Sequence, residues 1–144
     1  MLKHIPSILS PSLLKVLMEM GHGDEIVLAD GNFPVESMGR NTIVVRADGH
    51  GVPELLDAIL TLLPLDRYVE KPAAIMAVVP GDTEVPQIWE AYHALLQKHE
   101  PTHHAMESME RYAFYERAKK AYAIVATGET AIYANILLKK GVVK

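Results

Sequence analysis

The chain alternates between stretches with apolar residues at helical spacing and short runs that are apolar throughout. A first helix is predicted after Ser10-Pro11, because serine caps helices and proline fits their first position, and it ends at Gly21. The same spacing predicts helices over residues 51–63 and from about 85 to 98. Residues 110–120 have the composition of a further helix.

Apolar runs of strand length lie between these helices and after the last of them. They cover residues 26–29, 42–46, 73–79, 122–126 and 134–138. Residues 99–108, with a proline at position 101, are the most loop-like stretch. Strands that alternate with helices are typical of an α/β fold, in which helices cover both faces of a sheet. A length of 144 residues suits a single domain over residues 1–144.

The composition limits both the partners and the chemistry. A net charge of -4 gives no broad attraction to nucleic acid or to anionic membrane surfaces, so we expect neither as a partner. No apolar run approaches the ~18 residues of a membrane helix, and we expect a cytoplasmic protein. The chain has no cysteine, which excludes disulfides, thiolate nucleophiles and cysteine-based zinc sites.

His22 stands between two glycines, just past the first predicted helix and before the run 26–29. With little side-chain bulk beside it, the imidazole can be presented at a backbone turn. Histidine exchanges protons near neutral pH, as an acid/base catalyst must. A plainer interpretation is that His22 caps the helix, where an imidazolium interacts with the last carbonyl groups. The residues alone leave both interpretations open.

Three aspartates follow predicted strands, namely Asp30, Asp48 and Asp82. Ligands of α/β sheets gather in the loops at strand ends, so these carboxylates are candidate binding groups by position. Asp30 and Asp48 each precede a glycine and can equally be turn-formers. In the same way, Arg111 can belong to a charged helix face, and the tyrosines near it can belong to the core.

Several catalytic motifs can be set aside. Residues 99–103 spell the zinc-protease pattern His-Glu-x-x-His, but Pro101 interrupts the helical turn that must align the two histidines. Residues 21–23 follow a helix and open a strand, which is the reverse of a dinucleotide-binding fingerprint. There is no phosphate-binding loop that ends in Gly-Lys-Ser/Thr and no Gly-x-Ser-x-Gly nucleophile elbow. Kinase, nucleotide hydrolase and serine hydrolase functions are therefore not expected.

Several long motifs, in the correct order, resemble the fucose mutarotase branch of the ribose pyranase/fucose mutarotase family. In the first half they are Met1 to Lys3, Leu13 to Leu17, Glu19 to Ile26, Asp30 with Phe33-Pro34, and Arg46-Ala47-Asp48-Gly49. In the second half they are Arg111 to Ala118, Thr127-Gly128-Glu129, and Tyr133 to Gly141. The match spans essentially the whole chain and is weakest over residues 72–108.

The resemblance implies the RbsD-like fold, a three-layer α/β/α architecture with a mixed central sheet, assembled as a ring-shaped homodecamer. It also implies a sugar isomerase that uses no cofactor and no metal. His22 would be the proton donor, and the sugar would be bound by Asp30, Arg111, Tyr133 and Asn135. The cluster of His99, His103 and His104 receives no role from the resemblance.

The implied activity is exchange between the α and β anomers of L-fucopyranose, through opening and closure of the ring. Within the family, D-ribose pyranase is the alternative, and Arg111 favours the fucose branch because the pyranase branch tends to carry histidine there. A second alternative is a non-catalytic sugar-binding partner of a transporter or a kinase, because the residues alone supply only one candidate histidine.

Overall fold

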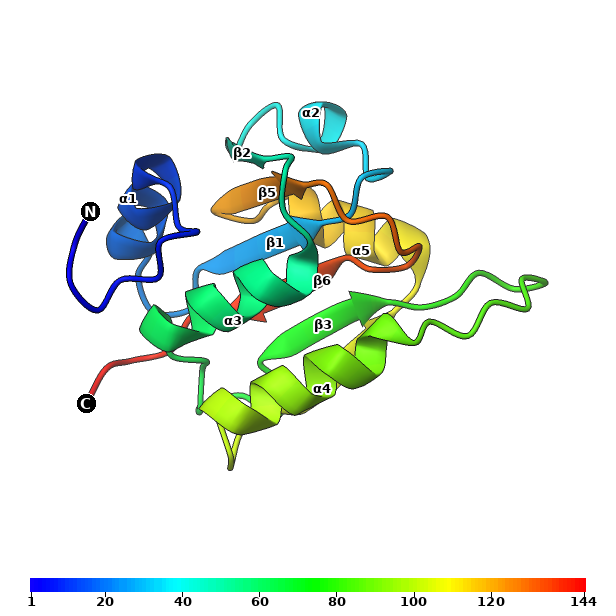
Figure 1. Cartoon of the computed structure of the whole chain (residues 1–144). Coiled ribbons are helices and arrows are strands. Elements are labelled where there is room, and N and C mark those ends of the chain that lie inside the picture. The colour runs from blue at the N-terminus through cyan, green and yellow to red at the C-terminus, as the bar shows by residue number, and fades with distance from the viewer.

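A six-stranded mixed sheet forms the centre of the molecule, and helices pack on both of its faces (Figure 1). This computed structural model describes residues 1–144. The helices are α1 (Pro11–Glu19), α2 (Val35–Met38), α3 (Val52–Leu62), α4 (Ile88–His99) and α5 (Arg111–Lys119). The strands are β1 (Glu25–Ala29), β2 (Ile43–Ala47), β3 (Ala73–Met76), β4 (Met106–Met109), β5 (Ala123–Thr127) and β6 (Ile136–Lys139). The predicted α/β fold class is confirmed.

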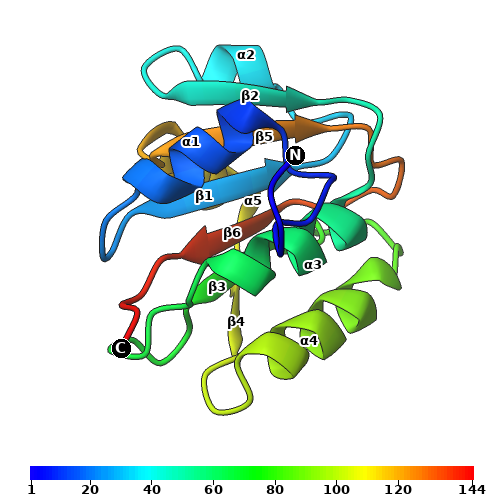
Figure 2. The ribbon, with the colours of Figure 1, turned by 60° about the vertical axis from the view of Figure 1, so that its left-hand side comes forward.

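The strand order is β2-β5-β1-β6-β3-β4, and only β6 runs against its neighbours (Figure 2). β1 pairs in parallel with β5 and antiparallel with β6, so that Leu28 lies opposite Val125 on one side and Ile136 on the other. β6 also pairs antiparallel with β3, which pairs in parallel with β4. The ends of β1, β3 and β4 and the start of β6 therefore meet at one edge of the sheet.

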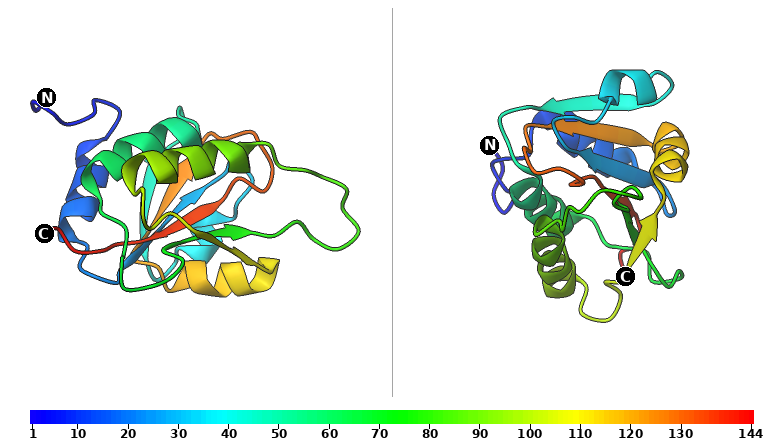
Figure 3. Two further views of the ribbon diagram at one scale, coloured as in Figure 1. Left: turned by 90° about the horizontal axis from the view of Figure 1, so that it is seen from below. Right: turned by 90° about the vertical axis from the view of Figure 1, so that its right-hand side faces the viewer.

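Two apolar cores lie on opposite faces of the sheet. α1, α3 and α4 cover one face, where Leu13, Leu55 and Leu96 are almost completely buried. α5 and the short α2 cover the other face, around Phe114 and Val35 (Figure 3). The apolar residues of β1 and β5 are buried on both faces, as their continuous apolar sequences require. The expected three-layer architecture is therefore present.

The observed elements differ from the predicted ones mainly over the middle of the chain. The strand expected over residues 73–79 ends at Met76, and the helix expected from about 85 begins at Ile88. The loop expected over residues 99–108 is wrong at its end, because Met106–Met109 forms β4. The short helix α2 was not predicted. β4 is the outermost strand of the sheet, and its sequence mixes polar and apolar residues without a strand pattern. It forms a strand because it pairs with β3.

Residues 77–87 leave the sheet after β3 as an extended arm, before the chain returns to α4 (Figure 1). Most residues of the arm are exposed, and Val85 keeps 71% of its surface. Gly81 turns the arm with a φ of 92°, a conformation that glycine adopts without strain. At the base of the arm, Trp89 Nε1 donates to the Tyr133 carbonyl at 2.8 Å. The arm thus lies beside the loop that leads into β6.

Gly128 is the point where the loops after β2 and β5 touch through their backbones. A Cβ atom on Gly128 would lie 2.0 Å from the Asp48 carbonyl oxygen. We expect Gly128→Ala to destabilise the fold by about 3 kcal/mol, because backbone atoms must move, and to lower Tm by roughly 10 °C. Gly49→Ala is the matched control, since a Cβ atom there meets nothing within 4 Å. Equal melting temperatures for the two variants in a thermal scan would contradict this expectation.

Candidate active site

A pocket of about 270 Å³ opens at the sheet edge where β1, β3 and β4 end and β6 begins. Its polar lining consists of Asp30, Asn32, Asp82, Arg111, Tyr115, Tyr133 and Asn135, and its apolar lining consists of Phe33, Met76, Val79 and Ile132. The fold therefore gathers all the residues that the resemblance implies as sugar ligands. Two of them, Asp30 and Asn135, are 105 positions apart in the sequence.

Asp30 is the buried carboxylate of the pocket, with 5% of its surface exposed. Its backbone N–H donates to Asn135 Oδ1 at 2.8 Å, which joins the end of β1 to the start of β6. Its carboxylate accepts the N–H groups of Asn32 at 3.0 Å and Ala134 at 3.2 Å. Burial raises the pKa of Asp30 above its ordinary value, although these N–H groups oppose the shift. Because the Asn135 oxygen is used, its NH₂ group is left for a ligand.

Tyr133 enters the pocket from a turn just before β6. Its φ of 56° lies in the left-handed region, which is uncommon for a residue other than glycine. Its hydroxyl donates to Asp82 Oδ2 at 2.6 Å. This hydrogen bond raises the pKa of the Tyr133 hydroxyl and lowers the pKa of the Asp82 carboxyl. At neutral pH the pair is therefore a neutral phenol and an ionised carboxylate.

Arg111 is the first residue of α5, directly after β4, where the Glu110 carboxylate caps the helix. Its guanidinium lies 5.4 Å from the ring centres of both Tyr112 and Tyr115, within the range of cation–π attraction. Its Nε donates to the Tyr115 hydroxyl at 3.2 Å. Tyr115 lines the pocket, yet it was not among the predicted site residues. Its spacing of one helical turn from Arg111 is the signal that could have found it.

His22 lies at the opposite edge of the sheet, in the turn between α1 and β1 at the left of Figure 1. Its side chain is 47% exposed, and its Nε2 lies 3.1 Å from Oδ1 of Asp66, whose own side chain is buried. The Asp66 carboxylate also accepts the Tyr68 N–H at 3.0 Å. Burial opposes ionisation of Asp66, but the Tyr68 N–H and the His22 ring outweigh it, so its pKa is lowered. The exposed imidazole of His22 is therefore held by the buried, ionised carboxylate of Asp66.

One copy of the chain does not bring His22 to the pocket. The 5 residues of β1 separate His22 from Asp30. At about 3.3 Å per residue they span roughly 16 Å, too far for one sugar ring to touch both side chains. The structure thus brings together Asp30, Arg111, Tyr133 and Asn135, and it leaves His22 apart.

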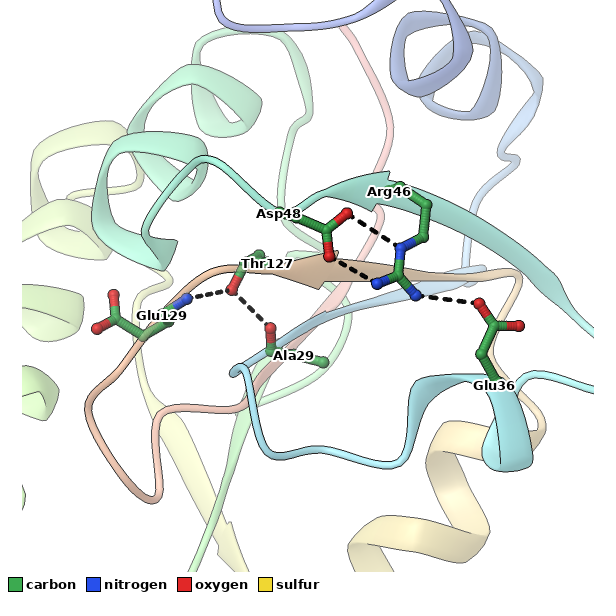
Figure 4. Close-up of polar contacts among 6 residues, drawn as sticks. All are labelled: Ala29, Glu36, Arg46, Asp48, Thr127 and Glu129. Carbon is green, nitrogen blue, oxygen red and sulfur yellow. Dashed lines mark hydrogen bonds and ion pairs between the residues drawn. The ribbon is translucent and has the colours of Figure 1, made fainter.

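Asp48, the strand-end aspartate after β2, is not among the residues that line the pocket. Figure 4 shows its carboxylate turned toward the guanidinium of Arg46. It forms a two-point ion pair with Arg46, with distances of 2.6 and 3.1 Å, and Arg46 also reaches Glu36 at 3.0 Å. Beside it, the Thr127 hydroxyl donates to the Ala29 carbonyl at 2.7 Å, which ties the end of β5 to the end of β1. These contacts stabilise the loops next to the pocket. Asp30, at the end of β1, lines the pocket itself, and so does Asp82, which lies in the arm and not at the end of β3 as predicted.

Local contacts account for the histidine cluster after α4. The helix ends at His99, so His99 and His103 do not share a helical face, as the intervening proline predicted. His99 Nε2 lies 2.7 Å from Asp57 Oδ1, and His104 Nδ1 lies 3.0 Å from the Glu100 carbonyl oxygen. No group of three or more His, Cys, Asp or Glu side chains is placed to hold a metal ion. None of the helices combines the length and the apolar character needed to cross a membrane.

The chain belongs to the RbsD / FucU transport protein family, whose sequence profile matches residues 3–143. Fucose mutarotase from Homo sapiens is 54% identical over 145 residues, which cover 98% of this chain and 94% of that protein. FucU from Bifidobacterium longum superposes with a TM-score of 0.95 at 59% identity, covering 97% of this chain and 99% of that chain. The fucose mutarotase from Streptococcus pneumoniae, solved in complex with L-fucose, gives 0.93 at 56% identity, covering 99% and 100%. The family resemblance and the RbsD-like fold are confirmed.

Proposed function

We propose that this protein is an L-fucose mutarotase, an isomerase that interconverts the α and β anomers of L-fucopyranose. One observation carries the proposal. Two carboxylates, a guanidinium, two amides and two phenols converge beside apolar side chains, in a chain that is 56% identical to a mutarotase solved with L-fucose. A monosaccharide needs several donors and acceptors for its hydroxyl groups, and the 6-methyl group of fucose needs apolar contact.

The pocket supplies complementary partners for such a sugar. Asp30 accepts hydrogen bonds from hydroxyl groups, and Arg111 and the Asn135 NH₂ group donate to them. Tyr133 adds a phenol on the side of the arm, and the ring of Phe33 offers an apolar wall. Together these groups bind and orient the pyranose, so that the anomeric centre meets its acid/base catalyst in one geometry.

Anomer exchange moves protons and no net electrons. The anomeric hydroxyl loses its proton, and the bond between C1 and the ring oxygen breaks with its electron pair on that oxygen, which takes up a proton. The open-chain aldehyde then rotates and closes on its other face by the reverse steps. The reaction balances without a redox partner. One positioned acid/base group contributes about 10² to 10⁴ in rate.

We assign the proton transfer to His22 of a second copy of the chain. Within one copy His22 is too far from Asp30, yet its side chain is 47% exposed and backed by Asp66. The ring of Tyr68, 5.4 Å from the imidazole, is exposed as well and keeps 69% of its surface. Val143, which lines the same surface pocket as Tyr68, keeps 75%. Contact with a neighbour would bury them. Together with the family resemblance, this supports a ring-shaped homodecamer whose pockets each receive His22 from a neighbour.

Saturation-transfer NMR of the sugar anomers tests the proposed function. We expect the protein to speed the exchange of L-fucose anomers well above the rate in buffer, and to do less for D-ribose. Faster exchange with D-ribose alone would favour ribose pyranase and overturn the proposal. Sugar binding without faster exchange of either sugar would favour a non-catalytic binding protein.

A further inference from the structure

The two tyrosines of the pocket have hydrogen-bond partners of opposite kind. The Tyr133 hydroxyl donates to the Asp82 carboxylate at 2.6 Å, whereas the Tyr115 hydroxyl accepts from Arg111 Nε at 3.2 Å. A phenol has a single proton to donate. The proton of Tyr133 is therefore occupied, and the proton of Tyr115 is free. Toward a ligand, the first phenol can only accept a hydrogen bond and the second can donate one.

Asp82 is held so that it imposes this direction. Its second carboxylate oxygen, Oδ1, accepts the Glu84 N–H at 3.0 Å, and its own N–H donates to the Val79 carbonyl at 3.1 Å. Both carboxylate oxygens are thus engaged, and an ionised carboxylate has no proton to offer in return. The lowered pKa of Asp82 keeps it in this form at neutral pH. In this pair the Tyr133 hydroxyl must therefore be the hydrogen-bond donor and the Asp82 carboxylate the acceptor.

The backbone of Tyr133 is fixed independently of its hydroxyl. Trp89 Nε1 donates to its carbonyl at 2.8 Å, and the next residue, Ala134, donates its N–H to the Asp30 carboxylate at 3.2 Å. These bonds hold the left-handed turn. The direction of the hydroxyl at the end of the ring is then set by Asp82, which the arm of residues 77–87 carries to the pocket.

We propose that Asp82 is a positioning residue that makes the Tyr133 hydroxyl a hydrogen-bond acceptor for the sugar. One hydroxyl group of the substrate is then recognised by the proton that it donates. Tyr115, with its free proton, supplies the opposite polarity in the same pocket. This inference rests on the proposed function, because it takes the ligand to be L-fucose.

Monofluoro analogues of L-fucose, with fluorine in place of the hydroxyl at C1, C2, C3 or C4, provide the test. Fluorine is close to a hydroxyl in size but donates no hydrogen bond. At the position that meets Tyr133, we expect the wild-type protein to prefer the hydroxyl sugar by about tenfold in Kd. In Asp82→Ala the phenol proton is free to turn toward the ligand. We therefore expect the preference at that one position to fall to about twofold.

Asp82→Asn covers the case in which Asp82→Ala loosens the arm. Its amide oxygen can keep the Glu84 N–H, which turns its NH₂ group toward Tyr133, so the phenol proton is freed without loss of the turn. The same fall in preference is expected. Thr83→Ala, a change on the same arm that leaves the Asp82 contacts in place, is the matched control and should keep the wild-type preference. If a variant binds all the sugars more weakly, the loss cancels, because each preference is the ratio of the Kd of a fluoro analogue to the Kd of L-fucose.

Unchanged preferences at every position in both Asp82 variants would overturn the inference, as would a wild-type protein that prefers no hydroxyl over fluorine. Both results leave the proposed function intact, provided that the wild-type protein binds L-fucose and speeds its anomer exchange. A wild-type protein that does neither removes the proposed function and this inference with it. The two failures are therefore distinguishable in one set of measurements.

Discussion

His22→Ala is expected to reduce the catalysed exchange of L-fucose anomers by about 10²- to 10⁴-fold while the sugar still binds. The proposed sugar ligands Asp30 and Arg111 belong to the pocket, so we expect removal of the imidazole to abolish the proton transfer and to leave most of the affinity. Saturation-transfer NMR measures the exchange, and titration with L-fucose measures the binding.

The matched control for this variant is His50→Ala. Like His22, His50 has a half-exposed imidazole next to a carboxylate: its side chain is 43% exposed and lies 3.3 Å from Glu54. It differs in place, because it follows β2 and lies just before α3. We expect His50→Ala to retain the wild-type exchange rate. If His22→Ala retained it as well, His22 would have no part in the catalysis.

Mixing experiments decide whether His22 acts across a subunit boundary. We expect His22→Ala and Asp30→Asn, each of low activity alone at a sugar concentration below saturation, to recover activity when they are unfolded, mixed and refolded together. In a shared site, roughly a quarter of the pockets then combine an intact Asp30 with an intact His22 from the neighbour. Sedimentation should show a species far larger than the 15.9 kDa chain. A fully active monomer, or a mixture without recovery, contradicts the shared site.

Asp30→Asn is expected to weaken L-fucose binding by about 10- to 100-fold. A hydrogen bond to a charged group contributes about 1.5–3 kcal/mol, and the amide keeps the shape of the side chain while it loses the charge. The amide can still accept the Asn32 N–H, but its NH₂ group faces the Ala134 N–H, so we expect a loss of stability of about 1 kcal/mol besides. Separate measurements of Kd and Tm distinguish the two effects.

Asp48→Asn is the matched control, because Asp48 stands in the same Ala-Asp-Gly triplet as Asp30. It follows β2, a parallel strand that β5 separates from β1 in the sheet. Its carboxylate is exposed and paired with Arg46, and it does not line the pocket. We expect unchanged sugar affinity and, at most, the small stability loss of an exposed ion pair. Equal affinity losses in the two variants would show that the charge of Asp30 has no specific role.

The charge of Asp30 also predicts the pH dependence of sugar binding. The ionised form is the better acceptor, so affinity falls as the pH drops through the pKa of Asp30. Because burial raises this pKa, the fall begins at a higher pH than for an ordinary aspartate. Measurement in the His22→Ala background removes that imidazole from the comparison, and Asp82, with its lowered pKa, titrates at more acid pH than an ordinary aspartate. In Asp30→Asn the affinity should no longer fall as the pH is lowered. If it still falls, another group causes the pH dependence.

Local patterns in the sequence predicted most of the secondary structure well. Ser10 does cap α1, with its Oγ accepting the Leu13 N–H at 3.2 Å. The strands predicted over residues 26–29 and 122–126 are β1 and β5, each within one residue of the predicted bounds. The errors fall where tertiary contacts override local preference. Residues 106–109 form a strand because β3 lies beside them, and residues 77–79 leave the sheet although they are apolar enough to continue it.

The sequence by itself determined the α/β fold class, the family and the identity of the candidate ligands, because helical spacing, caps and motifs are properties of neighbouring residues. Only the tertiary structure decided which of those residues meet. The reversed strand β6 brings Asn135 to Asp30 across 105 positions, and the arm brings Asp82 to Tyr133. The length of β1 keeps His22 at the opposite edge of the sheet. Strand order and direction depend on how all the apolar faces pack together, and no local pattern encodes them.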